Sequence, residues 1–376
     1  MTLRSDPEMM TSSAEELAGL RDSVRGVLAS RGTEADVRAA METPAGYDPS
    51  LWQQLAGLGI AGLVVPAEYG GSGAGPVELE AVTEEAGAAL LCSPLLGSSV
   101  LAAALLTESG DRAAQAALLP AIAAGTGIVA AAVTGPAGTW TADAVEVTAA
   151  EAGGGWALDG VADYVLGGQN AGTLLVAARE PAGLTWFVVA PEDAEITGLP
   201  TFDHTLRLAR VRLSAAPATL LGERGAGWVT AERALNLARV ALAGEQAGGA
   251  RRSLDMTVAY SKARVQFGRP IGSFQAIKHL AADLLLEAES AISAARHAAR
   301  ELAAGADGAQ LAVDLAAFAC ADAFTAVTAA SVQMHGGIAF TWDHPAHLYL
   351  RRARADAQLL GTPSFYRERY VQQLGG

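Results

Sequence analysis

The sequence predicts an α+β protein in three consecutive parts: a helical domain at residues 1–125, a β domain at 126–222 and a C-terminal helical bundle at 223–376. Three observations lead to this prediction. Apolar residues recur at helical spacing behind capping residues in the first part, short apolar or alternating runs fill the second, and long Ala- and Leu-rich stretches make up the third. With 376 residues, 51% of them hydrophobic, the chain is long enough for two or three domains with large cores.

Capping signals mark the starts of two helices in the first part. Ser13 and Glu16 have the spacing of a capping box, and apolar residues follow at helical spacing, namely Leu17, Leu20, Val24 and Leu28. Asp48 and Pro49 have the residue types of an N-cap and a first helical position. A second helix is therefore predicted from Pro49 through Leu55.

The middle part reads as short strands. Val145 and Val147 alternate with polar residues, and Leu174–Val176 and Trp186–Val189 are apolar runs of strand length. The dipeptide Asp159-Gly160 predicts a hairpin turn. In the third part, interruptions near 268–272 and 305–308 divide the Ala-rich sequence into three or four long helices, as in a bundle.

Composition excludes several classes of protein. The net charge of −14 and the pI near 4.9 argue against a nucleic-acid partner, because phosphate backbones are bound by clustered Lys and Arg. Met1–Met10 has no apolar core and is not expected to be a secretory signal. The apolar run Leu95–Leu106 is interrupted and too short to span a membrane. Cys92 and Cys320 lack metal-ligand spacing, so no metal is expected, and a cytoplasmic protein with two buried thiols is predicted.

The segment at 264–275 has the chemistry of a phosphate clamp. Arg264 supplies a planar, permanently charged donor, Gly268 and Pro270 predict a loop between two helices, and Gln275 offers an amide where the next helix starts. The alternative is an ordinary turn with a surface arginine.

A second glycine-containing segment, at 333–341, follows a predicted helix. Its paired Gly336 and Gly337 permit close approach of backbone N–H groups to an anion. These segments resemble two signatures of the acyl-CoA dehydrogenase family, R-x-x-F-G-x-x-I-x-x-F-Q and Q-x-x-G-G-x-G-[YF]-[TS]. A P-x-x-Y-G-G-x-G loop at 66–73 also matches, and all three occur in the family's order. Ala339 departs from the usual glycine.

The resemblance implies a fold, a cofactor and a reaction. It implies a β-barrel-like middle domain and a C-terminal four-helix bundle, non-covalent FAD, and conversion of an acyl-CoA to the trans-2-enoyl-CoA, with an acceptor such as an electron-transfer flavoprotein. The segment at 333–337 is expected to reach the flavin of a partner subunit, so the resemblance implies an oligomer. The residues it assigns to FAD are Arg264, Phe267, Phe274, Gln275, Gln333, Gly336, Gly337, Thr134, Leu166 and Thr362, and those it assigns to substrate are Asn236 and Arg239.

Both positions where relatives carry the catalytic glutamate are apolar here, Leu360 and Ala238. The reaction needs a carboxylate base. Glu245 lies two helical turns after Ala238 in an apolar stretch, where an ionised group costs desolvation unless it is paired or functional. Glu245 is therefore the candidate base, and the alternative is a structural ion pair with Arg251 or Arg252.

Asp356 is a weaker candidate for the base. Arginines surround it in sequence, at 351, 352 and 354, which favours a solvated salt-bridge face. The β domain also departs from the family, because glycines replace part of the motif after Thr134, and Leu166 removes a hydroxyl. This pattern resembles actinobacterial dehydrogenases of steroid side-chain breakdown, which form α2β2 assemblies with a paralogous subunit.

Three functions follow from the resemblance. The leading one is an acyl-CoA dehydrogenase subunit for a bulky or branched acyl group, active alone through Glu245 or only with a paralogous partner. The second is a non-catalytic partner subunit that contributes structure and part of a flavin site. The third is an FAD oxidase or monooxygenase on the same fold. Missing bases favour the second function, and the retained flavin motifs indicate that flavin contact survives.

Overall fold

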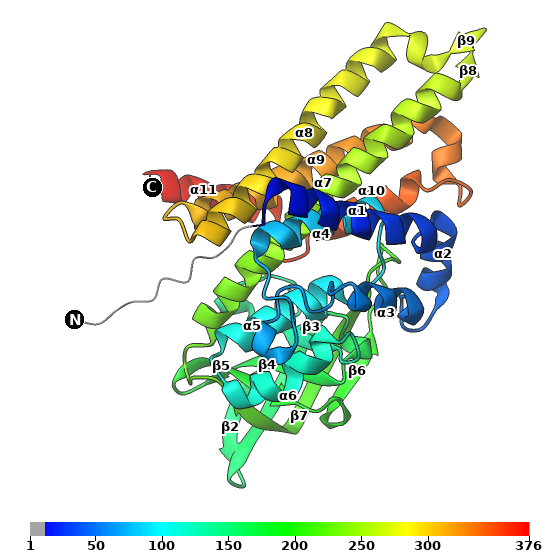
Figure 1. Cartoon of the computed structure of the whole chain (residues 1–376). Helices are drawn as coiled ribbons and strands as arrows, with labels where there is room; N and C mark the ends of the chain where they lie inside the picture. The colour runs from blue at the N-terminus through cyan, green and yellow to red at the C-terminus, as the bar shows by residue number, and fades with distance from the viewer. Residues whose placement is uncertain (1–11, 376) are drawn as a thin grey trace.

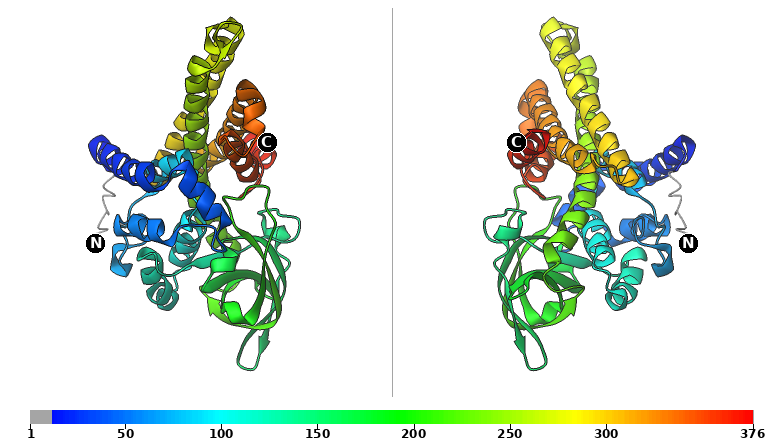
Figure 2. Two further views of the ribbon diagram at one scale, coloured as in Figure 1. Left: turned by 90° about the vertical axis from the view of Figure 1, so that its right-hand side faces the viewer. Right: turned by 90° about the vertical axis from the view of Figure 1, so that its left-hand side faces the viewer.

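The computed structural model describes residues 12–375, and Met1–Met10, where no secretory signal is expected, lies outside them. Figure 1 shows a β domain at one end of the molecule, N-terminal helices beside it, and a C-terminal bundle from which two long helices project. The two side views in Figure 2 show the same separation of strands from the projecting hairpin. The predicted fold class is confirmed.

Helices occupy the N-terminal part, as predicted. They are α1 (Ala14–Arg31), α2 (Glu34–Glu42), α3 (Pro49–Gly57), η1 (Ala67–Tyr69), α4 (Pro76–Ala88), η2 (Leu95–Ala102), α5 (Ala103–Glu108) and α6 (Arg112–Ala123). The capping box is confirmed, because Glu16 N donates to Ser13 Oγ at 3.2 Å and Ser13 N donates to Glu16 at 2.7 Å. Asp48 caps α3 by accepting from Ser50 N at 2.8 Å.

The middle part is a closed sheet. Its strands are β1 (Val129–Ala132), β2 (Thr148–Ala152), β3 (Gly155–Leu166), β4 (Thr173–Glu180), β5 (Gly183–Val189), β6 (Ala194–Gly198) and β7 (Leu208–Leu221). The order β4-β2-β3-β7-β5 returns to β4, because β5 also pairs with β4. The sheet therefore closes into a barrel, to which β1 and β6 add at β4 and β7.

The hairpin turn predicted at Asp159-Gly160 is wrong. These residues lie inside β3, at an irregularity in its pairing with β7. Gly160 has a φ of +135°, and a Cβ there would lie 2.9 Å from Val147 Cα, so the glycine serves a bulge and close packing. The turn between β2 and β3 is made by Gly153 and Gly154, both with positive φ, as a two-residue hairpin requires.

The C-terminal part is a helical bundle. It contains α7 (Gly227–Ala263), the short strands β8 (Val265–Gln266) and β9 (Arg269–Pro270), η6 (Ile271–Ser273), α8 (Gln275–Ala304), α9 (Ala309–His335), η7 (Gly336–Phe340), α10 (Ala346–Asp356) and α11 (Pro363–Gly375). Helix breaks fall where the glycines predicted them. Among the described residues one segment, Ala309–Phe340, is long and apolar enough to cross a bilayer, and half of its apolar window is buried. Since α9 packs on α7, α8 and α10, we interpret it as a core helix.

Small residues bring α4 and α7 into backbone contact. A Cβ on Gly87 of α4 would lie 1.9 Å from the carbonyl oxygen of Glu245, and one on Gly248 of α7 would lie 1.8 Å from that of Glu84. Side chains at these two positions would force the helices apart. The close contact leaves no room for a ligand between these stretches of α4 and α7.

Candidate functional site

A cavity of about 390 Å³ lies between the β domain and the end of α10. Its lining comes from the loop after β1, from β3, from the β6–β7 connection and from α10 with the following turn, and includes Gly138, Trp140, Tyr164, Phe202, Arg354 and Leu359. Three residues predicted to contact flavin are close in sequence to this lining: Thr134, Leu166 and Thr362. The volume is in the range of cofactor sites.

The side chains of these three residues are placed differently. Thr134 is buried and donates its hydroxyl to the carbonyl of Asp163. Leu166 is also buried and lines a separate cavity of about 30 Å³. Thr362 accepts a hydrogen bond from Phe365 N at 3.2 Å at the start of α11. The three segments therefore lie around the cavity, but the buried side chains of Thr134 and Leu166 do not line it.

Tyr164 is a cavity residue that the sequence analysis did not select. It lies between Ala162 and Val165, where the pairing of β3 with β7 is irregular, and its φ is +56°. The irregularity leaves Tyr164 38% exposed against the Gly138 loop, where a Cβ on Gly138 would lie 3.0 Å from its ring. Its position two residues before Leu166, in the segment that departs from the family, was the available signal.

The predicted diphosphate clamp lies at the tip of the α7–α8 hairpin. Arg264 caps α7 and is exposed, and within residues 12–375 its guanidinium forms no ion pair. Phe267 has a φ of +53° and is 89% exposed, with its ring edge-on to Phe274 at 6.1 Å. Gln275 opens α8. The guanidinium of Arg264, unpaired within the described chain, and the largely exposed ring of Phe267 suit contact with another molecule.

The second predicted flavin segment lies beside the first. Gln333 is in the last turn of α9, and Gly336, with a φ of +67°, ends that helix. The Tyr260 hydroxyl, one turn before Arg264, donates to the carbonyl of His335 at 3.3 Å. The structure therefore brings the two motifs to one end of the bundle.

The two halves of the expected flavin site are far apart within one chain. Figures 1 and 2 show the α7–α8 tip and the β domain at opposite ends of the molecule. Leu359 lines the 390 Å³ cavity and also lies next to Leu242 of α7 in a smaller cavity, so Leu242 marks the level of the β domain on α7. Arg264 follows Leu242 by 22 residues, or about 33 Å of helix. The two predicted groups of flavin residues therefore do not meet in one site of a single chain.

The positions of the two usual bases are sealed. Leu360 and Ala238 are 1% and 0% exposed. Leu360 has a φ of +61°, and its carbonyl accepts a hydrogen bond from the Tyr366 hydroxyl. That hydroxyl in turn accepts a hydrogen bond from Arg239 Nε at 2.8 Å. The cavity beside Leu360, which Arg239 also lines, measures about 10 Å³. That volume has no room for an acyl chain.

Glu245 forms a buried ion pair, but its partner is Arg352 of α10. Pairing with Arg251 or Arg252 is therefore wrong, and Arg251 instead bonds Asp255 and Glu289 on the surface. Whether Glu245 acts as a base stays a prediction, and its carboxylate is already engaged by a guanidinium.

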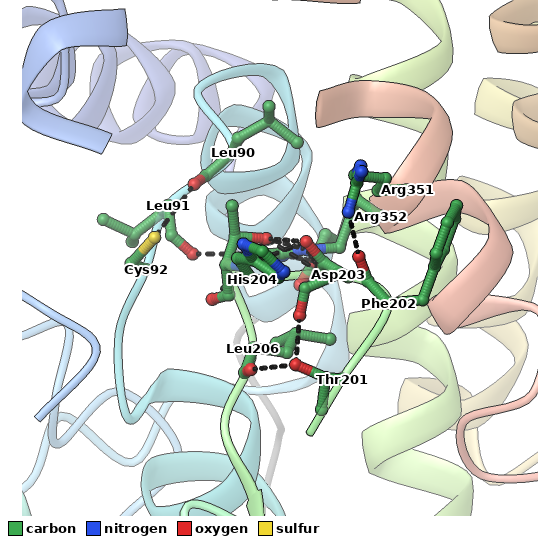
Figure 3. A network of polar contacts seen from close by, with 12 residues as sticks. Leu90, Leu91, Cys92, Thr201, Phe202, Asp203, His204, Leu206, Arg351 and Arg352 are labelled. Atoms are coloured by element: carbon green, nitrogen blue, oxygen red, sulfur yellow. Dashed lines mark hydrogen bonds and ion pairs between the residues drawn. The ribbon is translucent and has the colours of Figure 1, made fainter. Parts of the chain in front are cut away.

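Arg352 joins four parts of the chain. Its guanidinium bonds Asp203 at 2.9 Å and Thr205 Oγ1 at 2.6 Å in the β6–β7 connection, and the carbonyl of Leu91 at 3.5 Å (Figure 3). Burial opposes its charge, but the carboxylates of Glu245 and Asp203 raise the pKa of Arg352 above its ordinary value. The connection it holds lines the 390 Å³ cavity.

The solvated face predicted around Asp356 is wrong. Asp356 and Arg352 are each 1% exposed, while Arg354 is exposed. Tyr349, Arg352, Ala353 and Asp356 share the spacing of one helix face, and that face packs inward. Helical periodicity was the signal that could have shown this, but the run of arginines outweighed it.

Comparisons with known proteins agree with the sequence motifs. Residues 14–126 match the model "Acyl-CoA dehydrogenase, N-terminal domain" and residues 225–374 match "Acyl-CoA dehydrogenase, C-terminal domain". The chain is 36% identical over 357 residues to the acyl-CoA dehydrogenase IpdE2 of Mycolicibacterium smegmatis, covering 93% of this chain and 96% of that protein. It belongs to the acyl-CoA dehydrogenase family.

Three further proteins are similar to this chain. A chain of the ChsE4-ChsE5 complex of Mycobacterium tuberculosis matches with a TM-score of 0.88 and 29% identity, over 96% of this chain and 98% of that chain. It is also 37% identical to FadE34 of Mycobacterium tuberculosis, covering 94% of this chain and 47% of that protein. A glutaryl-CoA dehydrogenase from Mycobacterium smegmatis, solved with FADH2, shares the fold with a TM-score of 0.89 at 19% identity, over 97% of this chain and 95% of that chain.

The dehydrogenase residues expected to bind substrate are engaged within the chain. Arg239 is 2% exposed and donates Nη1 to Glu232 at 2.8 Å and to Asn236 at 2.7 Å. Asn236 donates its amide to Gln310 at 2.7 Å. These contacts stabilise the first turns of α7 and leave few polar groups of the two side chains for a ligand.

Proposed function

We propose that this chain is a subunit of an FAD-dependent acyl-CoA dehydrogenase and works with a paralogous subunit that carries the catalytic base. The observation that supports this most is the sealed base region, where the buried Leu360 and Ala238 replace both usual glutamates and the cavity beside Leu360 measures about 10 Å³. The acyl group would be bulky or branched, and an electron-transfer flavoprotein would accept the electrons in the cytoplasm.

The chain's own residues fit a flavin that is shared between two subunits. Arg264 and Gln275, with the aromatic pair Phe267 and Phe274, would hold a diphosphate and its adenosine on the exposed bundle tip. Tyr164 and the other cavity residues would pack against the ring of a flavin. When bound, FAD would accept the hydride from the β-carbon of the acyl thioester.

The base must be supplied from elsewhere in the assembly. In this proposal Glu245 is the counter-ion of Arg352, because a carboxylate held in a buried ion pair is a poor acceptor of the substrate's α-proton. The similarity to the ChsE4-ChsE5 complex supports a paralogue as the partner. The partner's glutamate would remove the proton.

Co-expression tests the proposal. The chain would be purified alone and after co-expression with a candidate paralogous subunit, and each sample would be examined by flavin absorbance, by sedimentation and by anaerobic bleaching with acyl-CoA. We expect FAD and bleaching only in the joint assembly, at less than one FAD per chain. A flavin-loaded monomer, or bleaching by this chain alone, would contradict the proposal.

A further inference from the structure

The sealed base region contains a small polar cavity. Its walls come from α7, α9, α10, the turn after α10 and α11, and the lining residues include Arg239, Gln246, Asp356, Leu360 and Tyr366. A volume of about 10 Å³ holds about one water molecule. Apolar cavities of this size stay dry, but this one is lined by a guanidinium, an amide and a carboxyl group.

Arg239 brings an unused donor to the cavity. Its Nε donates to the Tyr366 hydroxyl at 2.8 Å, and Nη1 donates to Glu232 and Asn236. Its third nitrogen, Nη2, is buried and has no hydrogen-bond partner within residues 12–375. A buried donor left unpaired costs free energy, and an ordered water removes that cost.

Asp356 brings an unused acid to the same cavity. Both carboxyl oxygens are buried, and neither has a hydrogen-bond partner in the described part of the chain. The charged groups that act on it are Glu245 on α7, Arg352 on α10 and Asp203 before β7, and Arg239 on α7 lines the same cavity. Arg352 is already balanced by Asp203 and Glu245. A further negative charge would therefore be unpaired.

We propose that the cavity binds a single water molecule, which accepts a hydrogen bond from Arg239 Nη2 and donates one to a protonated Asp356. Burial, together with the charge of Glu245, also raises the pKa of Asp356 well above its ordinary value. The water then pairs with Arg239 Nη2 and with one oxygen of the Asp356 carboxyl, and two hydrogen bonds lie within the range that a buried water makes.

The water would fill the remaining space in the region of Leu360. Leu360 and the Tyr366 hydroxyl border the same cavity, so side chains and one water fill the region where relatives place the base. This interpretation rests on the proposed function. The water site itself does not, because it follows from unpaired groups and volume.

Two buried aspartates provide a matched test by thermal unfolding of the assembled protein. Asp356→Asn tests the charge of Asp356, because the proposal holds that this carboxyl is protonated in the folded protein and that a neutral amide can replace it. Asp314→Asn is the control, since Asp314 is 0% exposed and bonds Arg369, Gln310 and Gln373. A raised folded pKa means that wild-type stability falls as pH rises above about 4, the unfolded value for Asp.

We therefore expect Asp356→Asn to melt at a higher temperature than wild type at pH 8 and at the same temperature near pH 4. Asp314→Asn should melt lower than wild type at pH 8. A loss of melting temperature at pH 8 for Asp356→Asn, equal to that of Asp314→Asn, would show an ionised Asp356 and overturn the proposal.

A crystal structure of the wild-type assembly is a second test that needs no variant. We expect electron density for one water within hydrogen-bond distance of Arg239 Nη2 and the Asp356 carboxyl. A dry cavity, or a carboxyl turned onto Arg352, would overturn the water site. Neither readout depends on activity, so failure of the water site and failure of the proposed function are distinguishable.

Discussion

Replacing Arg264 with alanine is expected to strip FAD from the assembled protein. The guanidinium is exposed at the α7–α8 tip, with no ion pair within the described residues to compete for it. Charge-assisted hydrogen bonds contribute about 1.5–3 kcal/mol, so we expect FAD to dissociate about 10- to 150-fold more readily. Fluorescence titration of the apo-assembly with FAD measures the change.

Arg251 is the matched control for this variant. It lies on the same helix and is also partly exposed, but it is paired with Asp255 and Glu289. Arg251→Ala should retain wild-type affinity for FAD. If Arg264→Ala retained it as well, or if the assembly preferred FMN, the tip would not be a diphosphate clamp.

Replacing Arg352 with methionine is expected to cause the largest loss of stability. The substitution would leave the buried carboxylates of Asp203 and Glu245 without their cation. Removing one partner of a buried ion pair costs about 3–5 kcal/mol. Urea unfolding of the assembly should show this decrease, and the 390 Å³ cavity should lose affinity for flavin, because Arg352 holds its β6–β7 wall.

Arg351→Met separates this effect from the loss of a surface charge. Arg351 stacks on Phe202 and Trp342 at 4.8 and 5.3 Å, contacts worth about 0.5–1 kcal/mol at exposed sites. Equal destabilisation by the two variants would refute the role given to Arg352. In a double-mutant cycle, Glu245→Gln should cost less in the Arg352→Met background than in wild type.

Local signals predicted much of the architecture. Ser13, Asp48 and the strand-length apolar runs are short-range patterns, and the structure has helices and strands at those places. The turn at Asp159-Gly160 failed because Gly160 serves close packing on Val147, a contact that local turn chemistry does not encode. Gly153 and Gly154 make the turn instead.

The candidate site depends on contacts that are distant in sequence. Arg352 bonds Glu245 and Asp203 across 107 and 149 residues, so a search for ion pairs near Glu245 could not find it. The predicted exposure of Asp356 was wrong for a related reason. The neighbouring arginines indicated a solvent-exposed face, but Asp356 and Arg352 lie on the face of α10 that packs inward. The motifs at 264–275 and 333–337 could be recognised from local sequence alone. The structure adds that they lie close together at one end of the bundle.

The central proposal is that a paralogous subunit, and not this chain, carries the catalytic base. Its most direct test is anaerobic bleaching of the flavin by acyl-CoA in an assembly that carries Glu245→Gln and a wild-type partner. Glutamine keeps a hydrogen-bond acceptor for Arg352 but cannot accept the substrate's α-proton. The proposal predicts the wild-type bleaching rate in a stopped-flow trace, with bleaching abolished instead by removing the partner's glutamate. A rate lowered by a factor of about 10² to 10⁴, with substrate still bound, would identify Glu245 as the base and contradict the proposal.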